Sequence, residues 1–127
     1  KKKKRKSLPF INLSTNIASL TAWSNDFNYK NYIARELSGT AIRGDVLVLI
    51  STSGGNVAKK QSLNLIEAAK FAKIKKIDLV SFLGSKGGSL KKYSKISYIV
   101  KSNNTPVIQE NHKLIFHLIS EILDQYY

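Results

Sequence analysis

Three hydroxyl side chains and two glycines stand together in the run Ser51-Thr52-Ser53-Gly54-Gly55-Asn56. The run follows a continuous apolar segment and precedes a helical pattern, which predicts a turn between a buried strand and a helix N-terminus. Hydroxyls, backbone N–H groups and the positive end of a helix dipole favour a phosphate, and glycines let the backbone approach the anion. Spacing alone leaves two interpretations open: a phosphate-binding turn, or an ordinary capping turn with Asn56 or Ser53 as N-cap.

The common nucleotide-binding motifs are missing. A Walker A loop needs Lys after its second glycine, and Gly44 is followed by Asp45. No G-x-G-x-x-G run follows a predicted strand. A phosphate held mainly by hydroxyls points to a small phosphorylated metabolite.

Two histidines lie on the last predicted helix. His112 falls at the margin of an apolar face formed by isoleucines and is expected to be a packing residue. Gln109, Lys113 and His117 share the polar side, where a histidine is solvated or lies in an interface. Neither histidine belongs to a HExxH-type zinc pattern.

Strands and helices alternate along the chain, which predicts an α/β fold with an open parallel sheet and helices on both faces. Ligands of such sheets bind beyond the carboxyl ends of the strands, where Asn25-Asp26, Ser51 to Asn56 and Ser85 to Gly88 are expected. The predicted domain covers residues 7–127. The predicted strands are 10–13, 45–50, 78–84 and 96–100. The predicted helices are 29–37, a helix that follows the turn after Asn56 and ends at about residue 75, and 106–126. A loop is predicted at 23–27 and a short turn at 90–93.

Composition and charge exclude several classes of protein function. The 127 residues include no Cys, which excludes a disulfide framework, a thiol nucleophile and Cys-ligated metals. The net charge is +13, and residues 1–6 supply six of these charges as a basic surface stretch without interleaved aromatic residues. Specific nucleic-acid binding is therefore not expected, and no apolar run is long enough to enter a membrane. The absence of Met suggests a fragment.

Several motifs in order resemble one known family. They are Gly44 to Gly54, Asn64 to Ala69, and Ile108-Gln109-Glu110 with His117 eight residues after Gln109. Together they resemble the sugar isomerase (SIS) domain, and the most similar subgroup is phosphoheptose isomerase. The Asn25-Asp26-Phe27 segment and the Leu8-Pro9 pair resemble that subgroup too, so the likeness extends from about Lys6 onward.

The resemblance implies a three-layer αβα, flavodoxin-like SIS fold in a cytoplasmic homotetramer. The implied enzyme converts sedoheptulose 7-phosphate to heptose 7-phosphate, in bacterial nucleotide-heptose synthesis for lipopolysaccharide or capsule. The alternative is a non-catalytic SIS module that binds a sugar phosphate or protein partner as a regulator. By the resemblance, Ser51, Thr52 and Ser53 hold the phosphate, Asn25, Asp26, Asn56 and Gln109 line the substrate site, His117 is catalytic, and Gln109 and His117 contact a possible zinc ion.

The chain also departs from the family pattern. The family's N-terminal helices, first strand, Gly-Asn-Gly-Gly-Ser turn and His/Glu pair are missing, so we expect a C-terminal piece that is inactive and poorly stable alone. Several extra residues, among them Lys59 and Lys60, stand before Asn64, and Ser85-Lys86 replaces a Lys-Asp pair.

The spacing of Gln109 and His117 limits any shared metal. Eight residues of straight helix separate them by roughly 12 Å, at ~1.5 Å per residue. One ion cannot take both from such a helix. Either Gln109 lies before the regular helix, or the two residues come from different subunits.

Overall fold

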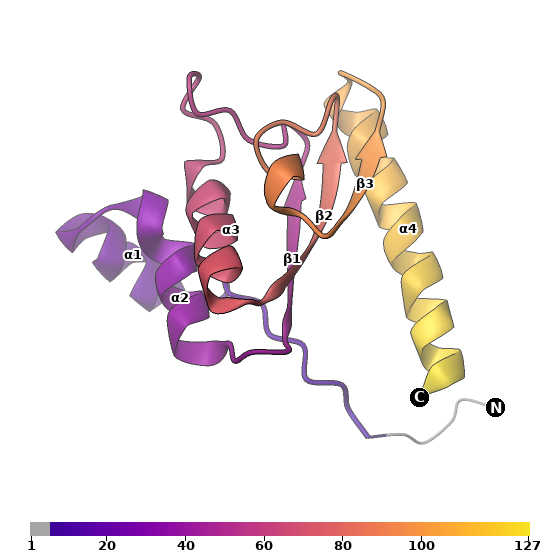
Figure 1. Cartoon of the computed structure of the whole chain (residues 1–127), viewed down its shortest axis with the longest axis horizontal. Helices are drawn as coiled ribbons and strands as arrows, with labels where there is room; N and C mark the ends of the chain where they lie inside the picture. The colour runs from indigo at the N-terminus through magenta and orange to yellow at the C-terminus, as the bar shows by residue number, and fades with distance from the viewer. Residues whose placement is uncertain (1–5) are drawn as a thin grey trace.

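Three parallel strands form the sheet at the centre of the chain (Figure 1). The computed structural model describes residues 6–127; residues 1–5, which hold most of the predicted basic stretch, lie outside the described residues. The strands are β1 (Val46–Ser51), β2 (Asp78–Gly84) and β3 (Ile96–Val100), in the order β1-β2-β3. Since all pairs are parallel, the carboxyl ends of the strands share one edge. The predicted α/β class is confirmed.

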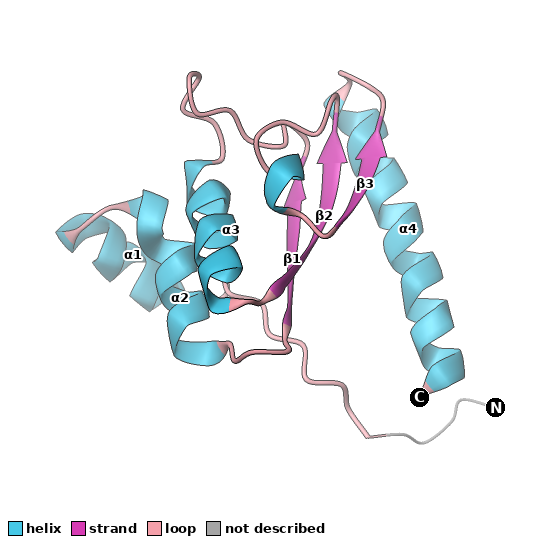
Figure 2. Ribbon diagram, in the orientation of Figure 1, coloured by secondary structure: helices cyan, strands magenta, loops and turns pink. Residues whose placement is uncertain are grey.

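Helices cover both faces of this sheet, which gives the predicted three layers (Figure 2). One side holds α3 (Leu63–Lys75) and α2 (Tyr32–Thr40), and the other holds α4 (Thr105–Tyr126). Asn104 caps α4 by accepting the N–H of Val107, and Pro106 stands in its first turn, where no intrahelical donor is needed. The helix predicted over 106–126 is confirmed almost to the residue.

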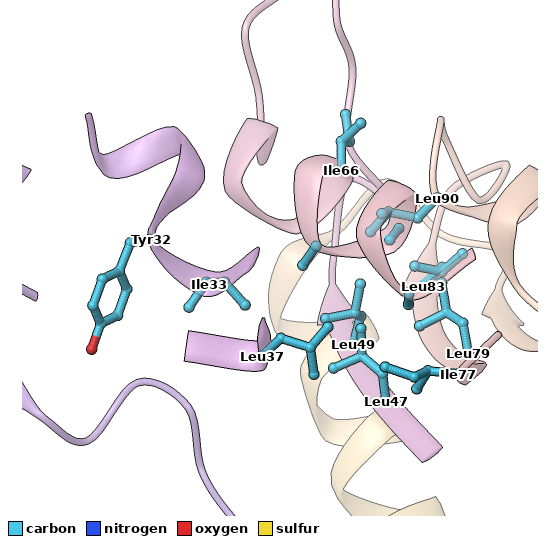
Figure 3. Packing of buried hydrophobic residues seen from close by; sticks show 13 residues of the cluster. Tyr32, Ile33, Leu37, Leu47, Leu49, Ile66, Ile77, Leu79, Leu83 and Leu90 are labelled. Atoms are coloured by element: carbon cyan, nitrogen blue, oxygen red, sulfur yellow. The ribbon is translucent and has the colours of Figure 1, made fainter. Parts of the chain in front are cut away.

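The core lies between β1, β2 and α3 (Figure 3). Ala68, Ala69 and Ala72 are buried on the face of α3 that meets the sheet, and their small side chains let the helix approach closely. Leu49 and Leu83 fill the space beneath them. Burying apolar area of this kind is the main force that holds α3 on the sheet.

The opposite face of β1 is uncovered. Leu47 and Leu49 point into the core, whereas Val46, Val48 and Ile50 are 56%, 45% and 51% exposed. The continuous apolar run predicts burial on both faces, and this is wrong for the single chain because α4 packs over β2 and β3 instead. An exposed apolar face on an edge strand is a surface that favours association.

The N-terminal quarter differs most from the sequence prediction. Residues 10–13 form no strand, because no described strand lies beside them to accept their ladder hydrogen bonds. The predicted loop at 23–27 is mostly helix: α1 (Ile17–Asp26) starts at Asn16, whose side chain caps the N–H of Ser19. Trp23 then stacks on Phe27 with ring centroids 4.3 Å apart. The sheet therefore has three strands among the described residues, not four.

The remaining connections follow the prediction closely. A short 3-10 helix, η1 (Tyr29–Asn31), leads into α2, and a second, η2 (Lys91–Tyr93), lies between β2 and β3. β2 and β3 have the predicted bounds. Within residues 6–127, every helix is too short or too polar to cross a lipid bilayer.

Candidate functional site

A recess of about 470 Å³ opens where β1 ends. It lies between the end of β1, the first turn of α3 and the first turns of α4, at the carboxyl edge of the sheet, where ligands of parallel sheets bind. We call it the serine recess, and its lining residues are Ile50, Ser51, Thr52, Ser53, Ser62, Leu65, Gln109, His112, Lys113 and Phe116.

Three serine hydroxyls converge in this recess. Ser51 Oγ lies 3.3 Å from Ser53 Oγ and 3.2 Å from Ser62 Oγ. The N–H of Gly54 donates to Ser51 Oγ, and the N–H of Gly55 donates to Ser53 Oγ. Because these two oxygens accept backbone donors, their hydroxyl hydrogens can turn from the neighbouring serine to an added acceptor such as a phosphate oxygen.

Ser62 is the N-cap of α3, so the predicted capping role of Asn56 or Ser53 is wrong. Its backbone is left-handed, with φ of 50°, and its side chain makes no capping hydrogen bond. The hydroxyl therefore faces the other serines instead of its own helix. The first N–H groups of α3 and the positive end of its dipole stand at the same place, which favours an anion.

The extra residues before Ser62 form a small hairpin. Asn56 and Gln61 exchange two backbone hydrogen bonds of 3.0 and 2.9 Å, and Asn56 Oδ1 accepts the N–H of Lys59. The insertion thus loops out and returns the chain to Ser62 beside the recess. Asn56 itself does not line the recess, and the sequence analysis missed Ser62 although it directly precedes the helical pattern.

Two glycine pairs fix the shape of the turn. Gly54 has φ of +67°, and a Cβ there would overlap the carbonyl of Gly87 in the loop after β2. Backbone bonds of 2.9 Å from Ser89 N–H to Gly55 O and 2.8 Å from Leu90 N–H to Gly54 O close this contact. The turn that carries the serines is therefore held from behind by the next loop.

His112 lines the recess from α4 and is buried, as predicted for a packing residue. Its Nε2 lies 3.1 Å from the carbonyl oxygen of Leu83. Because a carbonyl only accepts, Nε2 carries the hydrogen, and in the neutral ring Nδ1 is an acceptor. Nδ1 is buried and has no partner among the described residues. A residue of the recess wall thus carries one buried acceptor that no described residue satisfies.

Gln109 and His117 both lie on α4, so the alternative that Gln109 precedes the helix is wrong. Gln109 lines the serine recess, whereas His117 is exposed and outside its lining. One ion cannot reach both side chains, and the described residues contain no group of three or more His, Cys, Asp or Glu able to hold a metal. A zinc site therefore does not fit within this chain alone.

Asn25 and Asp26 lie at the end of α1 and do not line the recess. Asn25 Nδ2 donates to Asp26 Oδ1 at 3.0 Å. They follow no strand, because the strand predicted before them does not form. Of the predicted site residues, the structure brings together Ser51, Thr52, Ser53 and Gln109.

Known proteins of one kind match nearly the whole chain. It is 40% identical over 121 residues to a phosphoheptose isomerase from Sulfurimonas denitrificans, which covers 95% of the chain and 59% of that protein. It is 36% identical over 126 residues to one from Helicobacter pylori, with 99% of the chain and 62% of the relative covered. No family model matches. The chain spans about three fifths of the length of these curated relatives.

Solved structures agree with the sequence matches. A phosphoheptose isomerase from Francisella tularensis superposes with a TM-score of 0.86 at 31% identity, covering 95% of this chain and 62% of that one. The enzyme from Neisseria gonorrhoeae gives a TM-score of 0.80 at 32% identity, over 88% of this chain and 60% of that one. The chain shares the SIS α/β fold of these enzymes and is their homologue.

Proposed function

We propose that this homologue of phosphoheptose isomerases forms the phosphate-binding part of an enzyme that converts sedoheptulose 7-phosphate to heptose 7-phosphate. The observation that carries the proposal is the convergence of Ser51, Ser53 and Ser62, whose hydroxyl oxygens lie within 3.5 Å of one another at the start of α3. Hydroxyl donors and a helix N-terminus bind a phosphate without the loops that select a nucleotide.

The proposed reaction removes a proton from C1 of the ketose and returns one to C2, so that the carbonyl moves from C2 to C1. This requires a base that removes the proton and an acid that returns it, through an enediol intermediate. His117 has the chemistry of the base, since a histidine changes charge near neutral pH. Gln109 lines the serine recess and would hold the substrate, while His117 would act in a site completed by another subunit. Asn25, Asp26 and Asn56 are proposed substrate contacts of such a composite site.

A homotetramer is part of the proposal. Exposed apolar residues of β1 and α4 give the chain a surface to bury: Val46, Val48, Ile50, Leu114, Leu118, Ile119 and Ile122. Association over this surface would remove an uncovered sheet face from water. It would also bring α4 residues of one subunit to another, as the separated Gln109 and His117 require.

Zinc fits this chain poorly, because α4 supplies at most one of the two proposed ligands to any ion. An ion that used His117 would need its remaining ligands from residues outside this chain's own recess. The biosynthetic role that we propose, supply of heptose phosphate for nucleotide-activated heptose and surface polysaccharide, implies a cytoplasmic reaction. No observation favours the alternative of a non-catalytic regulator.

Binding of sedoheptulose 7-phosphate to the chain tests the phosphate site. Replacing Ser53 and Ser62 together by Ala should weaken binding by about tenfold or more, since two charge-assisted hydrogen bonds are lost. Ser120→Ala, on the exposed face of α4, is the matched control and should leave affinity unchanged. Unphosphorylated sedoheptulose should bind far more weakly.

Catalysis is tested separately on the full-length protein. It should convert sedoheptulose 7-phosphate, and His117→Ala should abolish turnover while the assembly stays folded. Tight binding of the substrate without any turnover by the full-length protein would contradict the isomerase activity and leave the phosphate site standing.

A further inference from the structure

A second recess, of about 560 Å³, lies at the carboxyl ends of β2 and β3. Three short segments line it: the loop after β2, the helix η2, and the end of β3 with the residues that follow. It shares no lining residue with the serine recess. We call it the lysine recess, and its lining residues are Ser85, Lys86, Lys91, Ile99, Lys101, Ser102 and Asn103.

Three lysines give this recess its chemistry. Lys86, Lys91 and Lys101 come from the three different segments, and no carboxylate stands among the lining residues. Lys30, Lys70, Lys95 and Arg35 each form an ion pair, and none of the three recess lysines forms one with a described residue. Three lysines around one volume, with no acidic residue in its lining, disfavour a cation and favour a multiply charged anion.

Two neutral donors complement the lysines. Asn103 Oδ1 accepts the Ser85 hydroxyl at 2.9 Å, so its amide nitrogen, without a partner among the described residues, is free to donate. Ser102 Oγ accepts the N–H of Asn104 at 3.0 Å, which leaves the hydroxyl hydrogen for a ligand. The recess thus presents donors and lacks acidic acceptors, as phosphate recognition requires.

The frame of the recess is fixed by backbone geometry. Ser85 N–H donates to Ser102 O at 3.0 Å and ties the two loops together. Gly87 has φ of +87°, and a Cβ there would lie 2.9 Å from Ile99 Cδ1 and 3.2 Å from Lys91 Cβ. The glycine therefore lets the stem of Lys91 pack against the loop that carries Lys86. The three exposed lysines thus surround an open recess whose backbone frame is fixed.

We propose that the lysine recess binds a polyphosphate anion, either pyrophosphate or the phosphate chain of a nucleotide. Three cationic groups match the charge of two or more linked phosphates better than that of a single phosphate dianion. The volume lies within the range of ordinary ligand sites, and Ile99 is the one lining residue with a wholly apolar side chain. This site is independent of the proposed function, because the sugar phosphate is assigned to the serine recess.

Calorimetric titration of the full chain with pyrophosphate at physiological salt tests the site. We expect one bound anion per chain, with affinity reduced by about tenfold or more in K86Q/K91Q/K101Q. The control K73Q/K75Q/K76Q removes the same charge from the end of α3 and should change affinity by less than about twofold. Thermal unfolding of both variants, and the single variant K101Q, separate lost binding from lost folding.

Three outcomes would overturn the proposal. Equal weakening in both triple variants would mean general attraction to a basic chain, and failure to saturate would mean that no site exists. Loss of pyrophosphate binding in S53A/S62A would assign the anion to the serine recess. Parallel titrations with ATP, AMP and inorganic phosphate identify the source: tighter ATP than pyrophosphate indicates a nucleotide, and equal affinities indicate the free anion.

Discussion

The two recesses at the carboxyl edge of the sheet differ in the groups that they offer to an anion. The serine recess combines neutral hydroxyls and a helix N-terminus with one lysine, Lys113, whereas the lysine recess has three lysines in its lining. They are neighbours, separated by the close contact of Gly54 with Gly87 and Gly88. Short directional bonds select an anion by shape, and ammonium groups select it by charge. If both proposals hold, one edge of a small sheet offers two distinct kinds of anion site.

The glycine contact between the recesses carries the largest expected effect. Gly54→Ala would place a Cβ against the carbonyl of Gly87 at a positive φ, and we expect a loss of about 3 kcal/mol in unfolding free energy. Urea denaturation measures it. Gly39→Ala is the control, because nothing lies within 4 Å of its Cβ position inside α2; it should be neutral or stabilising by about 0.5–1 kcal/mol. Equal stability of both variants would contradict the tight contact.

The second-largest expected effect is a difference in how strongly salt weakens ligand binding in the two recesses. A roughly tenfold rise in ionic strength should weaken pyrophosphate binding by more than about tenfold, because free ammonium groups are strongly screened. Sugar phosphate binding should weaken by about threefold, since hydroxyl hydrogen bonds supply most of the contact. Calorimetry at several salt concentrations measures both slopes. Identical slopes would erase the distinction between the recesses.

Substitution of His112 should weaken ligand binding in the serine recess and leave binding in the lysine recess unchanged. His112→Phe keeps a ring against Phe82 but leaves the Leu83 carbonyl without its donor, at a cost of about 1–2 kcal/mol in stability. It also changes a side chain that lines the serine recess, so sugar phosphate binding should weaken by about three- to tenfold. Pyrophosphate binding should not change, and a matching loss there would indicate general damage to the fold.

The smallest effect is expected outside both recesses, at Glu67 on α3. A hydrogen bond from Lys70, with further help from Lys30, holds the pKa of this carboxyl below its usual value. A lowered pKa means that the stabilisation is present above the unfolded pKa and is lost as the pH falls through the folded one. Glu67→Gln should cost about 0.5 kcal/mol near neutral pH, with solvent screening, and nothing well below pH 4. Affinity in either recess should stay unchanged.

The sequence predicts the parts of the fold that rest on local pattern. The strands 78–84 and 96–100 and the last helix are recognisable because apolar runs and breakers mark their ends. Residues 10–13 carry a strand pattern too, but a strand exists only beside a partner, and no neighbour is present among the described residues. Pattern alone cannot report a missing partner.

The candidate sites also include residues that the local sequence pattern predicts and residues that it does not. The Ser51 to Ser53 turn is predictable because strand, glycines and helix follow in order. Ser62 escapes prediction because a hairpin of extra residues separates it from the turn it rejoins. The lysine recess escapes because its charges come from three segments, which only the packing of η2 and β3 brings together.

A crystal structure of the chain with sedoheptulose 7-phosphate tests the central claim most directly. The account predicts phosphate oxygens within about 3 Å of the hydroxyls of Ser51, Ser53 and Ser62, at the start of α3. A phosphate seated in the lysine recess, with the serine recess unchanged, would contradict it.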